Sequence, residues 1–314
     1  MFGIPKGYLT YKARKQVLDL PGPGKTVFLS GTGRGGTTWL SNVINHDNAY
    51  RYMFEPFHPA YVPLISHFKS KQYLRPDNRD NTYLLPARRI LAGKINNPWI
   101  NKWNRKILIR KRLIKDIRTN LMLGWLKTNF PEIPIILLVR HPLAVVSSQM
   151  ANGWQADLTV FLSQPELMQD YLTPYRDLLE NPGNHFEALI LQWCVETRVP
   201  LAQSGAGGIR VAFYENIFSY PEKELPELFA FIGQPFDPSV MDMLGQASKT
   251  ARLDSPVRKG KNPVDHWRHN ITAQQKEYCL EMLRRFGLDH IYGIDPLLAL
   301  RPQADFLRMV RTDG

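Results

Sequence analysis

Residues 26–40, TVFLSGTGRGGTTWL, join a short apolar run, a glycine-rich loop and the start of an amphipathic segment. Residues 26–30 predict a buried strand, and the apolar residues from Trp39 to Ile44 fall on one face of a following helix. Between them, residues 31–38 form a loop whose backbone N–H groups can converge on a phosphate at the helix N-terminus. The stretch therefore predicts a phosphate site, with a glycine-rich turn that binds nothing as the alternative.

The same strand-then-helix order recurs further along the chain. Residues 135–139 are a continuous apolar run, as in a parallel strand that is covered on both faces, and Pro142 suits the first position of the next helix. Residues 209–213 predict another strand. Helical patterns cover residues 120–130, 185–202, 222–232 and 273–286. Alternating strands and helices predict an α/β, P-loop-type three-layer fold, with a central, mostly parallel sheet flanked by helices.

The domain plan has three parts. Residues 1–24 form a basic N-terminal arm that ends in the turn-rich segment PGPG, and residues 25–314 form one domain. Residues 57–112 are poorly patterned and rich in Pro, Asn, Arg and aromatic residues. We expect them to form an insertion that covers the acceptor, with a plain surface excursion as the alternative.

The composition limits the class of protein. The chain has 314 residues, 44% of them hydrophobic, which excludes a disordered chain. Its two cysteines, Cys194 and Cys279, cannot form a disulfide framework or a four-cysteine zinc site. No long uncharged apolar run occurs, so we expect no membrane span and a cytoplasmic location. The formal net charge of +12 favours an anionic partner, and by itself allows a non-enzymatic polyanion-binding protein.

The phosphate loop departs from that of kinases and ATPases. Thr37 stands where a Walker A loop has lysine, and the strand at 135–139 ends in Arg140 and His141 instead of a metal-binding aspartate. A P-loop kinase or NTPase is therefore the less favoured alternative, and Mg²⁺ dependence of nucleotide binding would discriminate. The pattern predicts a nucleotide that is bound without metal.

Two motifs resemble those of the PAPS-dependent sulfotransferases. Residues 30–40 are similar to that family's 5′-phosphosulfate loop, and residues 137–148, LLVRHPLAVVSS, to its 3′-phosphate segment. Weaker matches are Trp39 and Tyr214, near the adenine in that family, and residues 258–260, which resemble a segment that closes over the 3′-phosphate. The resemblance implies PAPS as donor, PAP as product, no metal, and the following cofactor contacts: Gly33, Arg34, Gly35, Gly36, Thr37, Thr38, Trp39, Arg140, Ser148, Tyr214, Arg258, Lys259 and Gly260.

A third segment supplies the candidate base. Residues 52–58, YMFEPFH, resemble the Phe-Glu-Pro segment of the carbohydrate 6-O-sulfotransferases, in which the glutamate is the base. This resemblance implies that Glu55 is the base and that Arg34 and Lys115 are the leaving-group cations. The histidine of the cytosolic branch is replaced by Ile117, which cannot accept a proton.

We expect partial burial to raise the pKa of Glu55. The alternatives are a structural carboxylate paired with an arginine, and His58 as the base. The implied reaction is in-line, metal-independent sulfuryl transfer to the hydroxyl of a carbohydrate or another small alcohol. The expected acceptor is a small molecule or a glycan, anionic ones included, and no nucleic acid is expected as a partner.

Overall fold

The computed structural model describes residues 17–19, 26–205, 207–247, 250 and 262–293. Their central feature is a five-stranded sheet in the order β3-β5-β2-β6-β7, in which every neighbouring pair is parallel. A short two-stranded parallel sheet pairs β1 with β4. The strands are β1 (Leu18–Asp19), β2 (Thr26–Gly31), β3 (Arg51–Phe54), β4 (Leu108–Ile109), β5 (Arg112–Asp116), β6 (Ile135–Val139) and β7 (Ile209–Phe213).

Helices fill most of the remaining described chain. The α-helices are α2 (Thr37–Ile44), α3 (Asn81–Leu91), α4 (Leu123–Asn129), α5 (Pro142–Ala151), α6 (Thr159–Leu162), α7 (Pro165–Leu167), α8 (Arg176–Glu180), α9 (His185–Ser204), α10 (Tyr214–Ser219), α11 (Pro221–Phe231) and α12 (Ala273–Arg285). Shorter helical turns are η1 (Pro63–Ile65), η2 (Asn120–Met122), η3 (Met168–Leu172), η4 (Thr173–Tyr175), η5 (Pro238–Met243) and η7 (His266–Asn270). None of the described helices is both long and apolar enough to cross a bilayer.

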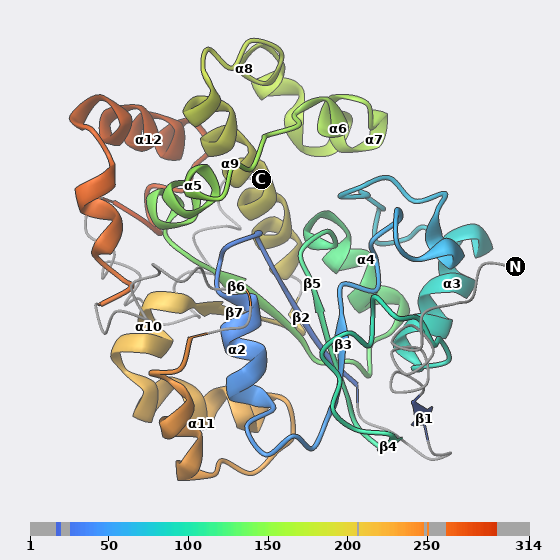
Figure 1. The fold of residues 1–314 in the computed structure, drawn as a ribbon. Helices are drawn as coiled ribbons and strands as arrows, with labels where there is room; N and C mark the ends of the chain where they lie inside the picture. The colour runs from blue at the N-terminus through green and yellow to red at the C-terminus, as the bar shows by residue number, and fades with distance from the viewer. Residues whose placement is uncertain (1–16, 20–25, 206, 248–249, 251–261, 294–314) are drawn as a thin grey trace, which may run out of the picture.

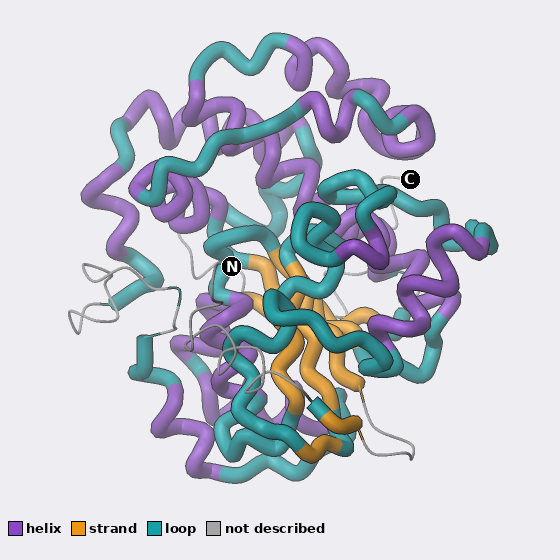
Figure 2. Tube along the Cα trace, turned by 45° about the vertical axis from the view of Figure 1, so that its right-hand side comes forward, coloured by secondary structure: helices purple, strands orange, loops and turns teal. Residues whose placement is uncertain are grey.

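The sheet separates two hydrophobic cores. Along β6, Ile135, Leu137 and Val139 enter the core shared with α5, α9 and α12, whereas Ile136 and Leu138 enter the core shared with α2 and α11. This alternation follows from the two-residue period of a strand. Figures 1 and 2 show the strands at the centre of the molecule with helices on both sides. The predicted three-layer α/β fold with a parallel sheet is therefore confirmed.

The predicted elements agree closely with the observed ones. The strands at 135–139 and 209–213 have the predicted bounds, and the four helical patterns correspond to η2 with α4, α9, α11 and α12. Pro142 occupies the first turn of α5, and Nδ1 of His141 accepts a hydrogen bond from the Leu143 N–H at that helix start.

The segment 57–112 is more ordered than its composition indicates. It contains α3, which begins where Asp80 accepts a hydrogen bond from the Thr82 N–H. The buried guanidinium of Arg51 fastens the segment to β3, because it donates to the carbonyl oxygens of Gly93 at 2.8 Å and Ile95 at 2.6 Å. The segment is thus packed against the edge strand of the sheet.

Candidate active site

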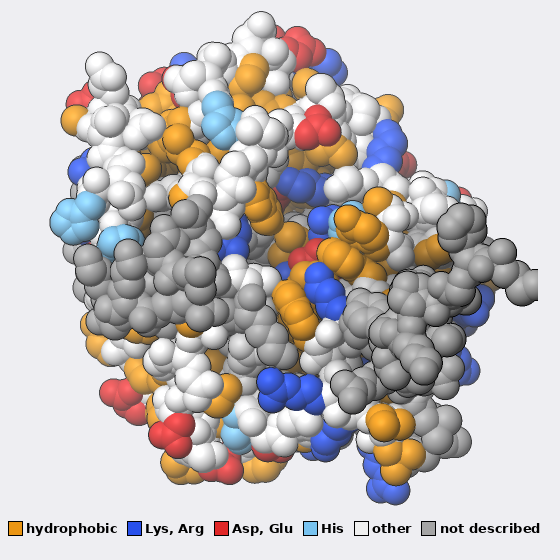
Figure 3. All heavy atoms as spheres, viewed as in Figure 1, with side chains coloured by type: hydrophobic (Ala, Val, Ile, Leu, Met, Phe, Trp, Pro, Cys, Tyr) orange, Lys and Arg blue, Asp and Glu red, His pale blue; other side chains and the backbone are white. Residues whose placement is uncertain are grey.

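A cavity of about 460 Å³ opens at the carboxyl ends of the five strands. Because all five strands are parallel, the residues that follow them meet at the same edge of the sheet. Arg34 follows β2, Glu55 follows β3, Ile117 follows β5, Arg140 follows β6 and Tyr214 follows β7, and each of them lines this cavity. Figure 3 shows a hollow in this face, with hydrophobic side chains around it and charged side chains inside.

The cavity brings together most of the residues predicted from the sequence. Of those predicted, its lining includes Arg34, Gly36, Thr37, Thr38, Trp39, Glu55, Lys115, Arg140, Ser148 and Tyr214. Gly33 and Gly35 belong to the same loop, although they do not contribute to the lining formed by the described residues. Arg258, Lys259 and Gly260 lie outside the described residues.

The glycine-rich loop delivers the N-terminus of α2 to the cavity. Gly36 is the N-cap residue and has φ of 96°, a left-handed conformation that favours glycine. A Cβ at this position would lie 2.6 Å from the ring of Tyr214. Gly36 has no side chain that could cap the helix, so the first N–H groups and their partial positive charge can serve a phosphate.

Arg34 connects this loop with the second predicted motif. Its Nε donates to Oγ of Ser148 at 3.0 Å, and one of its terminal nitrogens donates to the Thr250 carbonyl oxygen at 2.9 Å. Ser148 lies on α5, which begins directly after Arg140 and His141. The two motifs that resemble the 5′- and 3′-phosphate segments are therefore neighbours around one cavity.

Arg140 is held by two backbone carbonyl oxygens and one aromatic ring. Its terminal nitrogens donate to the carbonyl oxygens of Arg34 at 3.4 Å and Pro263 at 2.9 Å, and its guanidinium lies 4.2 Å from the ring centre of Tyr214. The buried Nε of Arg140 has no hydrogen-bond acceptor among the described residues. A buried donor without a partner is costly, so a ligand oxygen would stabilise this arginine.

Trp39 and Tyr214 form an aromatic pair in the lining. Their ring centroids are 4.9 Å apart, and the indole N–H of Trp39 donates to the Leu244 carbonyl oxygen at 3.1 Å. Both side chains are almost fully buried. The pair offers a fixed apolar surface of the kind on which a base stacks.

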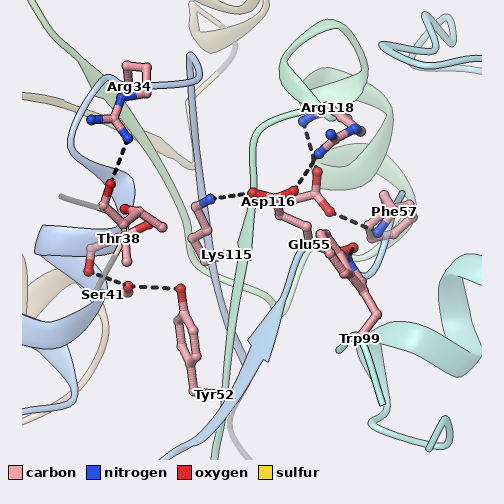
Figure 4. Close-up of polar contacts among 11 residues, drawn as sticks. Arg34, Thr38, Ser41, Tyr52, Glu55, Phe57, Trp99, Lys115, Asp116 and Arg118 are labelled. Carbon is pink, nitrogen blue, oxygen red and sulfur yellow. Dashed lines mark hydrogen bonds and ion pairs between the residues drawn. The ribbon is translucent and has the colours of Figure 1, made fainter. Parts of the chain in front are cut away.

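Glu55 follows β3 in a tight turn and carries a buried carboxylate that contacts two cations (Figure 4). Its φ is 45°, and its backbone is held by a bond from its own N–H to the Lys115 carbonyl oxygen and by one from the indole N–H of Trp99. Oε1 accepts from Nζ of Lys115 at 2.7 Å, and Oε2 accepts from Arg118 at 2.5 Å. The carboxylate is therefore oriented from both sides.

The expectation that burial raises the pKa of Glu55 is wrong for this arrangement. Burial does push the pKa upward, but the adjacent charges and hydrogen bonds of Lys115 and Arg118 outweigh it, and the pKa lies below its ordinary value. Glu55 is consequently ionised at neutral pH. Glu55 is paired with Arg118, as the alternative of a carboxylate paired with an arginine predicts. The paired carboxylate still lines the cavity.

Asp116 is a second buried carboxylate, which the sequence analysis missed. It lies behind the turn, where its two oxygens accept hydrogen bonds from the backbone N–H groups of Phe57 and Arg118, each at 2.8 Å. Burial, with the nearby charge of Glu55, raises the pKa of Asp116 to about 6. Asp116 thus ties together the two backbone segments that carry Glu55 and Arg118.

Arg118 itself was also missed. It lies three residues after Lys115, just past the end of β5, and its partner Glu55 is far away in the sequence. The sequence places two cationic residues, Lys115 and Arg118, at the carboxyl end of β5, and this pattern could have identified Arg118 as a site residue.

His58 lies beside the site but does not belong to the described lining of the cavity. Its ring contacts those of Tyr61 and Trp99, at centroid distances of 4.5 and 5.3 Å. Burial and the charge of Arg118 lower the pKa of His58 to about 4, which leaves it neutral.

Comparisons with known proteins identify the family. The model of the sulfotransferase family matches residues 26–238, more than half of the chain, and this range includes most of the residues that line the cavity. The chain therefore belongs to the sulfotransferase family. This assignment disfavours the kinase or NTPase alternative.

The solved structures to which the chain is similar are remote in sequence. Mouse sulfotransferase SULT7A1 complexed with PAP is 14% identical, with 97% of this chain and 92% of that chain covered and a TM-score of 0.46. The sulfotransferase domain of the Synechococcus PCC 7002 olefin synthase is 17% identical, with 90% and 100% covered and a TM-score of 0.44. The sulfotransferase domain from the curacin biosynthetic pathway is 15% identical, with 84% and 99% covered and a TM-score of 0.44. A search of curated proteins found no significant match.

Proposed function

We propose that the protein transfers the sulfuryl group of PAPS to an acceptor hydroxyl, with Glu55 as the general base. One observation carries this proposal: a single cavity joins the glycine-rich loop, the Arg140 and Ser148 side chains and an ionised carboxylate flanked by two cations. A plain phosphate site would not need the buried carboxylate.

The residues present suit both phosphate groups of this nucleotide. The loop N–H groups at the start of α2, with Arg34, would hold the 5′-phosphosulfate end. Ser148 and Nε of Arg140, which has no acceptor among the described residues, would hold the 3′-phosphate. Trp39 and Tyr214 would contact the adenine. Arg258, Lys259 and Gly260 stay predicted contacts.

The chemistry is divided among the side chains near Glu55. PAPS supplies an activated sulfuryl group attached to a phosphate that leaves with the nucleotide. Glu55, ionised and fixed by Arg118, would take the proton of the acceptor hydroxyl. Lys115 and Arg34 would offset the negative charge that develops on the leaving phosphate.

No metal enters this scheme, and the absence of a metal requirement stays a prediction. No group of three potential metal-binding side chains occurs among the residues that the structure describes. The cytoplasmic location and the absence of a nucleic-acid partner likewise stay predictions. The prediction of a carbohydrate acceptor rests on the resemblance of residues 52–58, and the prediction that this acceptor is anionic rests on the net charge of +12.

Calorimetric titration with PAP tests the cofactor assignment against the polyanion-binding alternative. Specific binding should persist when salt is raised from low to moderate concentration, should not require Mg²⁺, and should exceed the affinity for ATP. Binding that collapses with salt and does not discriminate among polyanions would support the alternative.

A further inference from the structure

Most of the excess positive charge lies in one segment of the chain. Residues 81–115 contain ten Lys or Arg and no Asp or Glu, and the whole chain has a formal net charge of +12. Only Lys115 among these ten belongs to the described lining of the cavity. The nucleotide site therefore does not account for this charge, which indicates a second anionic partner.

Four of the ten cations are held within the fold. They are Lys102, Lys111, Arg112 and Lys115, which are buried or half-buried. Lys102, for example, packs over the rings of Phe54 and Trp99, at 3.8 and 3.6 Å from their centres.

The other six cations form no ion pair with any residue that the structure describes. All of them are exposed except Lys106, which is half-buried. They are Arg88, Arg89, Lys94, Arg105, Lys106 and Arg110. Their charges are therefore available to a partner.

These cations gather at the edge of the sheet opposite the cavity. Oγ1 of Thr26 donates to the Leu91 carbonyl oxygen at the end of α3, at 2.9 Å, and the Arg51 N–H donates to the Lys111 carbonyl oxygen at 2.8 Å. Arg112, the first residue of β5, pairs with Thr26 and Arg51, the first residues of β2 and β3. The end of α3 and the segment before β5 thus meet at the amino ends of the strands, whereas the cavity opens at their carboxyl ends.

Two apolar side chains project from the segment before β5. Ile107 is 68% exposed and Leu108 is 58% exposed, more than any other large hydrophobic side chain in the described ranges. Arg105 and Arg110 flank them in the sequence. In Figure 3, hydrophobic side chains project at the lower right, where Figure 1 places β4, with Lys or Arg side chains beside them. Such an exposed apolar pair gains free energy when a partner covers it.

Helix α3 presents the same combination. Leu85 is 52% exposed, and Arg88 and Arg89 follow it by three and four positions, on the same face of the helix. We define the basic edge as the six available cations together with Leu85, Ile107 and Leu108.

The combination of charge and apolar surface selects the kind of partner. A nucleic acid or a sulfated glycan would bind the cations but would leave Ile107 and Leu108 in water. The interface of an anionic bilayer offers phosphate headgroups to the cations and an apolar layer to the two side chains. The basic edge therefore favours a lipid surface.

We propose that the basic edge docks the protein on an anionic lipid bilayer, with Ile107 and Leu108 at the boundary between headgroups and acyl chains. The cavity lies at the opposite edge of the sheet, so a docked molecule keeps its nucleotide site open to water. The proposal concerns peripheral binding and does not depend on the proposed function.

Co-sedimentation of the full chain with lipid vesicles tests this surface. The protein should bind vesicles of equal parts phosphatidylserine and phosphatidylcholine at least about tenfold more tightly than vesicles of phosphatidylcholine alone, and added salt should weaken the binding. Equal binding to both kinds of vesicle, or binding to neither, would overturn the proposal.

Two variants separate a bilayer from a soluble polyanion. Ile107→Ser/Leu108→Ser should weaken binding to the anionic vesicles about tenfold and leave heparin binding unchanged, because only the bilayer contacts the apolar pair. Arg105→Gln/Lys106→Gln/Arg110→Gln should weaken both. If the serine variant binds the vesicles as tightly as the unsubstituted protein, the basic edge binds polyanions in general and the proposal fails.

The matched control removes the same charge elsewhere. Arg176→Gln/Lys223→Gln/Arg284→Gln replaces exposed cations of α8, α11 and α12, and this variant should retain most of its vesicle binding. An equal loss in the control and in the variant of the basic edge would show attraction by net charge alone and would overturn the proposal. Every variant should keep the Tm and the Kd for PAP of the unsubstituted protein, which separates lost docking from lost folding.

Discussion

Nζ of Lys115 lies 2.7 Å from Oε1 of Glu55, and the sheet itself sets this distance. In the parallel pairing of β3 with β5, Phe54 is opposite Lys115, and the Glu55 N–H donates to the Lys115 carbonyl oxygen at 2.7 Å. Two neighbouring strands therefore present a carboxylate and an ammonium group to one cavity. The pair is preformed, and it fixes the charge state of the proposed base.

Replacement of Lys115 by methionine should raise the pKa of Glu55. The charge and hydrogen bond of Lys115 lower this pKa in the intact site, so their removal leaves the upward effect of burial less opposed. The acidic limb of kcat/KM against pH should therefore move to higher pH, and the maximal rate should fall. A pH profile of sulfuryl transfer measures the shift, with Lys115→Arg as the charge-preserving control. An acidic limb that does not move, or moves to lower pH, would contradict the assignment.

The stability contribution of Asp116 should depend on pH in a defined direction. Its pKa is about 6 in the folded protein and 3.8 as an ordinary value, so protonation favours the folded state. This contribution is full below pH 3.8 and is lost as the pH rises through about 6. Asp116→Asn lacks this contribution. The Tm of the unsubstituted protein minus the Tm of this variant should therefore fall as the pH rises from 4 to 7. Thermal melts in this range provide the measurement, and a difference that grows with pH would refute the account.

Arg140 and Ser148 should discriminate nucleotides by their 3′-phosphate. Arg140→Ala should weaken PAP binding by about tenfold to a hundredfold, as expected for a lost charge-assisted hydrogen bond. AMP, which lacks the 3′-phosphate, should lose much less affinity. Ser148→Ala should act in the same direction. Titration of each variant with both nucleotides gives the comparison, and equal losses would remove these residues from the 3′-phosphate site.

Gly36 should tolerate no side chain. Gly36→Ala combines φ of 96° with a Cβ placed 2.6 Å from the Tyr214 ring. We expect a loss of about 1–3 kcal/mol in the free energy of unfolding, together with weaker PAP binding. Gly245→Ala is the control, because a Cβ there would meet nothing within 4 Å among the described residues. Denaturant unfolding and PAP titration of both variants test this point, and equal behaviour of the two would contradict it.

The sequence predicted those strands whose two faces are both buried among apolar residues. β6 and β7 are nearly continuous apolar runs, so their bounds could be read directly. β5 has the sequence RLIKD and was missed as a strand, because its buried Lys115 and Asp116 depend on partners in the turn that follows β3. Helix α3 contains Pro86, which concealed its helical pattern.

In the candidate site, too, local features could be predicted from the sequence, whereas contacts between distant residues could not. Contacts made by local motifs, such as the N-terminus of α2 and the start of α5, could be predicted from adjacent residues. The pairing of Glu55 with Arg118 spans 63 positions and depends on the order of strands in the sheet. The direction of the Glu55 pKa shift was therefore not accessible from the residues that flank it.

Sulfuryl transfer from radiolabelled PAPS by Glu55→Gln, in a buffer with EDTA, tests the central proposal most directly. The unsubstituted protein should transfer sulfate without added metal. The variant should lose about a thousandfold in kcat while its Kd for PAP stays close to that of the unsubstituted protein. A variant that retains its turnover, or an unsubstituted protein that needs a divalent cation, would contradict the assignment of Glu55 and the metal-independent reaction.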